Sequence, residues 1–181
     1  MIRRDHRLWF SLFCLINCVI GMHSAWGAVG LSIHSLNFAA NAPIPTVYTC
    51  SGDNKSPALT WTGVPVTAKA LAIVVRDPDA PRGSYVHWVL YNLPANVSAL
   101  PEAVPTTPTI VEGAEQGVNG SGKTGYQGPC PPPGPTHHYH FTLFALDSKL
   151  DLPPGATAVE VEQAMTGHVV ASAEVVGTFA R

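Results

Sequence analysis

Two carboxylates, Asp77 and Asp79, follow a very apolar run (ALAIVVR) in the segment DPDAP, residues 77–81. They could orient a histidine or accept a proton, although Asp-Pro pairs are also common in simple polar turns. Pro78 and Pro81 restrict the backbone where the chain leaves the predicted strand. Because both carboxylates would have to turn back toward one site, we predict a cis peptide bond in this segment, at Ala80–Pro81.

A histidine in the next apolar segment, YVHWVLYN, could serve the same site. Strand alternation predicts that His87, Val89 and Tyr91 share one face of this segment, with Trp88 and Leu90 on the other. A single histidine in a strand is more often structural than a ligand-binding residue, so His87 needs partners from elsewhere in the chain.

Such partners occur in the segment HHYHF, residues 137–141. Alternation places His137 and Tyr139 on one face and His138 and His140 on the other. Either pair could bind a metal ion with help from the carboxylates, or could simply begin a polar strand. We expect neither a metal ion nor a cofactor here.

The stiff segment GPCPPPGP precedes these histidines. Prolines lack an amide hydrogen, so the few remaining donors, at Gly128, Cys130 and Gly134, could bind an anion. Another segment, Gly117–Thr124, matches the phosphate-binding pattern G-x-x-x-x-G-K-[ST]. That pattern needs a helix beginning at the lysine, and the following GYQGPCPPPGP cannot form one, so we do not expect nucleotide binding.

Short runs rich in Val, Thr and aromatic residues, separated by Pro and Gly, predict antiparallel strands. They do not alternate with helices, which argues against a parallel sheet. We predict a mainly β protein, an antiparallel β-sandwich, with a long loop over residues 94–135 and one or two short helices near the C-terminus. The expected strands are Leu31–Phe38, Leu59–Thr62, Ala70–Arg76, Tyr85–Asn92, His138–Leu146 and Ala173–Phe179.

The clearest helix signal follows Pro153-Pro154-Gly155. Thr157 can cap a helix in which Val159, Val161, Ala164 and Met165 suit one apolar face. We expect this helix to close one end of the sandwich.

The N-terminal residues predict export. Three arginines precede an apolar run, Leu8–Ile20, and Ala25 and Gly27 provide small residues for cleavage after Gly27. Residues 1–27 are therefore a predicted signal peptide and residues 28–181 one domain, periplasmic or secreted, with no membrane span left after cleavage. Lipid attachment at Cys18 and an uncleaved anchor are alternatives, although Asn17 does not suit a lipid-attachment site.

Composition and cysteine count agree with export of one globular domain. The 181 residues are 46% hydrophobic and 12% charged, and the net charge of −2 excludes a strongly basic nucleic-acid-binding protein. Only Cys50 and Cys130 would remain after cleavage, and we predict that they form a disulfide.

Several motifs in order resemble the phosphatidylethanolamine-binding protein family, in its bacterial Raf-kinase-inhibitor-like branch. They are YTCSGDNKSPALTW (48–61), DPDAP (77–81), HWVLYNLP (87–94), KTGYQGPCPPPG (123–134), HHYHFTLFALD (137–147) and MTGHVVASAEVVGTF (165–179). The resemblance implies a β-sandwich with a small anion-binding pocket. The residues that match this pocket are Asp77, Asp79, Pro81, His87, Gly128, His137 and Tyr139.

We therefore expect a non-enzymatic binding module for a small anionic ligand, such as a phospholipid head group. The resemblance also implies a possible protein partner, such as an inhibited serine protease. The alternative is a small envelope hydrolase in which His87 and His137 act as acid and base.

Overall fold

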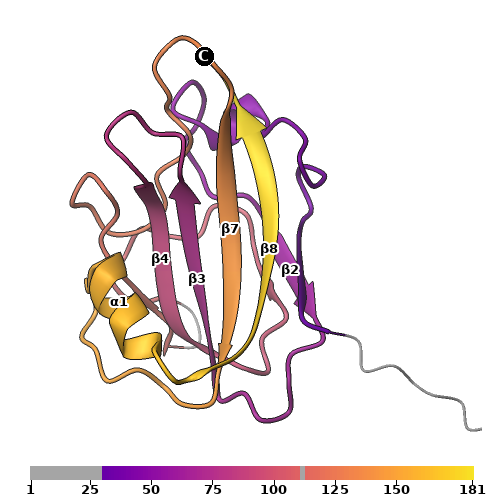
Figure 1. Ribbon diagram of the computed structural model, residues 1–181, viewed down its shortest axis with the longest axis vertical. Helices are drawn as coiled ribbons and strands as arrows, with labels where there is room; N and C mark the ends of the chain where they lie inside the picture. The colour runs from indigo at the N-terminus through magenta and orange to yellow at the C-terminus, as the bar shows by residue number, and fades with distance from the viewer. Residues whose placement is uncertain (1–29, 111–112) are drawn as a thin grey trace, which may run out of the picture.

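The computed structural model describes residues 30–110 and 113–181, so the predicted signal peptide lies outside the described residues. Its strands form two antiparallel sheets, one with the order β1-β2-β5 and one with the order β6-β4-β3-β7-β8. Figure 1 shows β4, β3, β7 and β8 side by side in the larger sheet. No helix in this part of the chain is long and apolar enough to span a membrane. The elements are β1 (Ser32–Ser35), a 3₁₀ turn (Thr46–Tyr48), β2 (Leu59–Thr62), β3 (Ala70–Asp77), β4 (Tyr85–Pro94), β5 (Ala99–Leu100), β6 (Glu115–Gln116), β7 (His137–Leu146), α1 (Ala158–Met165) and β8 (Val169–Phe179).

The main core lies between the two sheets. Leu59 and Trp61 of β2 belong to one buried cluster with Ile73, Trp88 and Phe141 of the large sheet. Each of these side chains is at most 1% exposed, and burial of apolar surface on this scale is the main stabilising contribution in a sandwich. The predicted mainly β sandwich with a helix near the C-terminus is confirmed.

The prediction that the helix closes one end of the sandwich is wrong. Helix α1 covers the outer face of the large sheet beside β4 (Figure 1). Thr157 caps it as expected, in a reciprocal capping box with Glu160. Val161 and Met165 are buried against the sheet, whereas Val159 is 59% exposed and does not belong to the apolar face. The helix lies here because β3 is buried along nearly its whole length and needs cover on both faces.

The predicted loop over residues 94–135 contains two short strands, β5 and β6. Strand β6 pairs with the edge of β4, and the Gln116 side chain accepts a hydrogen bond of 2.7 Å from the Trp88 indole. Farther along the loop, the amides of Gly120 and Gln127 donate to Val86 O and His87 O, which places these later residues beside the start of β4.

Candidate functional site

A cavity of about 290 Å³ lies where β3 ends and where β4 and β7 begin. Because β3 is antiparallel to both neighbours, these three ends meet at one edge of the large sheet. Four of the seven predicted ligand-binding residues line the cavity, and three do not: Asp79, Gly128 and Tyr139. The lining residues are Asp77, Ala80, Pro81, Tyr85, His87, Gln127, Cys130, Pro131, Pro132 and His137.

His87 reaches the cavity because of an irregularity in β4. The register passes from Val75 opposite Trp88 to Arg76 opposite Val86, so His87 is the extra residue of a β-bulge. The prediction that His87 shares a face with Val89 and Tyr91 is therefore wrong. Those two residues pack on the helix side of the sheet, whereas the His87 ring lies 5.1 Å from the ring of Tyr139 in the main core.

One nitrogen of His87 is already occupied. Nδ1 lies 2.7 Å from the backbone oxygen of Gln127, and because a carbonyl only accepts, Nδ1 carries the hydrogen. Burial lowers the pKa of His87, and the hydrogen bond to Gln127 offsets part of this effect. The free protein thus holds a neutral imidazole whose Nε2 is an acceptor, and an anion bound there would favour its protonation.

His137 is oriented by a carboxylate. Its Nδ1 donates to Asp77 Oδ2 at 2.7 Å, and both side chains are buried. The other oxygen of Asp77 accepts the amide hydrogen of Asp79 at 2.9 Å. Asp77 therefore fixes the orientation of the His137 ring, which leaves His137 Nε2 as the ring nitrogen available to a ligand.

Asp79 points away from the cavity. Its Oδ2 accepts hydrogen bonds from both the amide and Nδ1 of His138, each at 2.8 Å. The hydrogen bond from the His138 side chain is the largest of the effects that lower the pKa of Asp79. The two carboxylates of DPDAP thus have different roles: Asp77 serves the site and Asp79 fixes the start of β7.

The predicted cis peptide bond is absent, since every peptide bond in the described residues is trans. The chain reverses instead through the Asp77–Asp79 side-chain turn and a second turn in which the Gly83 amide donates to Ala80 O. Gly83 adopts a φ of +93°, a conformation open to glycine. Spreading the reversal over two turns removes the need for a cis proline.

Tyr139 lies behind His87 rather than at the cavity surface. Its side chain is fully buried, and among the described residues its hydroxyl has no hydrogen-bond partner. Burial, followed by the nearby Asp77 carboxylate, raises the pKa of Tyr139, so the phenol stays protonated; Asp77 is close enough to influence the hydroxyl but lies outside hydrogen-bond geometry. An unpartnered buried hydroxyl is unusual and is a source of local instability.

Two of the three predicted amide donors are used within the protein. The Gly128 amide donates to Asn54 Oδ1 at 2.8 Å, and the Gly134 amide donates to the backbone oxygen of Arg181. A Cβ at position 128 would lie 2.3 Å from the Tyr48 oxygen, so Gly128 is required for close packing. Cys130, which lines the cavity, is the remaining candidate donor.

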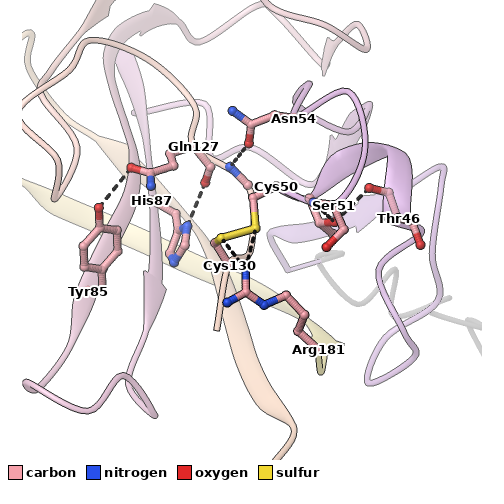
Figure 2. The surroundings of a disulfide bond; sticks show 11 residues. Thr46, Cys50, Ser51, Asn54, Tyr85, His87, Gln127, Cys130 and Arg181 are labelled. Carbon is pink, nitrogen blue, oxygen red and sulfur yellow. Dashed lines mark hydrogen bonds between the residues drawn. A yellow bond between two sulfur atoms is a disulfide. The ribbon is translucent and has the colours of Figure 1, made fainter. Parts of the chain in front are cut away.

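A disulfide between Cys50 and Cys130 borders the cavity (Figure 2). The guanidinium of Arg181 lies 3.6 Å from the sulfur of Cys130, so it brings a positive charge close to the site. Among the described residues, no cluster of three or more His, Cys, Asp or Glu side chains is arranged to hold a metal ion.

Three residues near the cavity escaped the sequence analysis. Tyr85 donates to the side chain of Gln127 at 3.0 Å and stacks edge-on against His87 (Figure 2). Tyr85 could have been found, because it precedes His87 by two residues in the same strand. Gln127 and Arg181 have no distinctive spacing, and only tertiary contacts bring them here.

The segment Gly117–Thr124 forms a tight turn in which Val118 and Thr124 pair and Asn119 accepts the amide of Lys123. No helix begins at Lys123, so the phosphate-binding pattern lacks the element that it requires.

Comparisons with known proteins agree with this arrangement. The profile of the family described as phosphatidylethanolamine-binding protein matches residues 34–180. A UPF0098 protein of Methanothermobacter thermautotrophicus is 46% identical over 153 residues, which cover 84% of this chain and 99% of that protein. A Mycobacterium tuberculosis protein that carries the name lipoprotein LppC is 45% identical over 82% of this chain and 72% of its own length.

Solved structures show the same fold. Escherichia coli YbcL, described as a member of the mammalian PEBP family, has a TM-score of 0.78 and 33% identity, with 83% of this chain and 98% of YbcL covered. The Chlamydia trachomatis homologue CT736 has a TM-score of 0.77 and 39% identity, with 84% and 98% covered. Because the family profile matches residues 34–180 and the solved structures share the fold, the chain belongs to the phosphatidylethanolamine-binding protein family.

Proposed function

We propose that this protein is a non-enzymatic binding module for a small anionic group of the phosphate type. The observation that carries the proposal is the convergence of His87 and His137 on one cavity, each with Nδ1 held by an oxygen and Nε2 left free. Protonated at Nε2, each ring can donate a charge-assisted hydrogen bond to an anion. Asp77, the carboxylate that lines the cavity, directs its two oxygens at donors within the protein, His137 Nδ1 and the Asp79 amide.

Export is part of the same proposal. It is supported by the N-terminal arginines and apolar run, by the Cys50–Cys130 disulfide, and by a relative that carries the name lipoprotein. Disulfides persist mainly in oxidising compartments, which favours the periplasm or the exterior. Inhibition of a serine protease, implied by the family, would be a further activity, measurable as slower peptide hydrolysis when the protein is added.

No observation favours the hydrolase alternative. The lining of the cavity holds no free serine or cysteine, because Cys130 is bonded to Cys50. His87 and His137 therefore have no neighbouring nucleophile to activate among the lining residues.

The test is calorimetric titration with sulfate between pH 5 and 8. Sulfate keeps its charge over this range, so any pH dependence belongs to the protein. We expect the affinity to fall as pH rises, approaching about tenfold per unit if one proton is taken up with each anion. His87→Gln and His137→Gln should each weaken binding about tenfold or more, since hydrogen bonds to charged groups contribute roughly 1.5–3 kcal/mol.

His168→Gln is the matched control, because His168 pairs with Asp147 on the exposed surface, away from the lining residues. His87→Gln leaves the Asp77–His137 pair intact and serves as the second variant if His137→Gln does not fold. Unchanged affinity in the folded variants, or no sulfate binding at millimolar concentration, would overturn the proposal.

A further inference from the structure

A second, larger cavity of about 600 Å³ adjoins the histidine cavity. Gln127 lines both, so the two spaces lie on either side of one residue. Asn54, Lys123 and Thr124 also line the second cavity, and no carboxylate does. Its volume is in the usual range for small-molecule sites, but its lining is polar.

The side chains of this cavity offer hydrogen-bond donors. Asn54 Oδ1 accepts a hydrogen bond from the Gly128 amide, which leaves the NH₂ group of Asn54 free. Gln127 Oε1 accepts a hydrogen bond from the Tyr85 hydroxyl, which leaves the NH₂ group of Gln127 free (Figure 2). Lys123 has no ion pair with any described carboxylate. Amide NH₂ groups and an ammonium suit a ligand that is rich in acceptor oxygens and disfavour a second positive charge.

The wall that carries Lys123 is held in place before any ligand binds. The side-chain oxygen of Asn119 accepts from the amide and hydroxyl of Ser121 and from the amide of Lys123. Asn119 also donates to the backbone oxygen of Gly125 at 3.0 Å. Because this wall is already ordered, less conformational entropy is lost when a ligand binds, which favours tighter binding.

We propose that the two cavities form one site for a phosphorylated, hydroxyl-rich ligand of the sugar phosphate class. The phosphate occupies the histidine cavity, and the sugar lies in the second cavity with its oxygens facing Lys123, Asn54 and Gln127. This inference rests on the proposed anion binding at His87 and His137. Such a site would also discriminate between ligands by charge, because the ammonium of phosphoethanolamine would face Lys123 with no carboxylate beside it.

Calorimetry of the purified protein with methyl phosphate, glucose 1-phosphate and phosphoethanolamine tests the inference. All three are phosphomonoesters of similar charge at the phosphate, so differences report on the attached group. We expect glucose 1-phosphate to bind at least tenfold more tightly than methyl phosphate, and phosphoethanolamine to bind no more tightly than methyl phosphate. Lys123→Gln should weaken glucose 1-phosphate binding about fivefold and leave methyl phosphate unchanged.

Lys149→Gln is the control, since Lys149 lines neither cavity. Equal affinity for methyl phosphate and glucose 1-phosphate, together with no effect of Lys123→Gln, would overturn the sugar phosphate inference while leaving anion binding intact. Tighter binding of phosphoethanolamine than of glucose 1-phosphate would also overturn it. Absence of methyl phosphate binding would instead remove the proposed function itself.

Discussion

Removal of the disulfide should strongly destabilise the fold. Cys50 and Cys130 are separated by 80 residues, and in the chain-entropy account a crosslink that closes such a loop stabilises by about 4.5 kcal/mol. Domains of this size unfold with roughly 5–15 kcal/mol in total, so the loss would be a large part of the stability. Both cysteines are exposed, so a mild reductant should reach the bond.

The assay is urea unfolding of the oxidised protein, the reduced protein and the Cys50→Ser/Cys130→Ser variant. The last two should lose similar free energy, and their m-values should rise, because an unfolded chain without the crosslink exposes more surface. The Gln127 amide donates to His87 O independently of the disulfide, so the loop should stay attached to β4 at this point in the reduced protein. Sulfate affinity should still fall, because Cys130, Pro131 and Pro132 line the cavity.

The double variant must itself be insensitive to reductant, which controls for other effects of the reagent. A loss below about 1 kcal/mol with an unchanged m-value would refute the loop-entropy reasoning for this protein.

Tyr139→Phe should raise stability by about 1–3 kcal/mol, because it removes an unpartnered buried hydroxyl, and a lower melting temperature would show that the hydroxyl is bonded after all. Gly128→Ala should destabilise, since its Cβ would lie 2.3 Å from a backbone oxygen; an unchanged urea midpoint would contradict the packing described. Burial lowers the pKa of His87, so the unfolded chain binds this proton at a higher pH than the folded protein does, and stability should fall as the pH drops below about 6.5. His87→Gln should flatten this fall in urea midpoints measured from pH 7.5 to 5, and an equally steep fall in the variant would exclude His87 as its cause. N-terminal sequencing of the protein from its native host should start at or near Ala28, whereas a cytosolic chain that starts at Met1 would contradict export.

Local patterns predicted much of the framework. Strand β2 was predicted with its observed bounds, and Thr157 marked the start of α1. In β7, period-two alternation correctly separated buried His137 and Tyr139 from the outward His138 and His140. These features depend on residues close together in the sequence, since alternation, capping and turn preference are set by the local backbone.

The site itself depended on contacts that no local pattern contains. A bulge against β3 turned His87 to the inner face, and only the neighbouring strand determines where an extra residue falls. Asp77 and Asp79 look alike in DPDAP, but the first pairs with His137 and the second with His138, because successive residues of β7 face opposite sides of the sheet. The sequence by itself determined the strands, the helix start and the family resemblance. The tertiary structure decided which polar groups form hydrogen bonds within the protein and which remain free to bind a ligand.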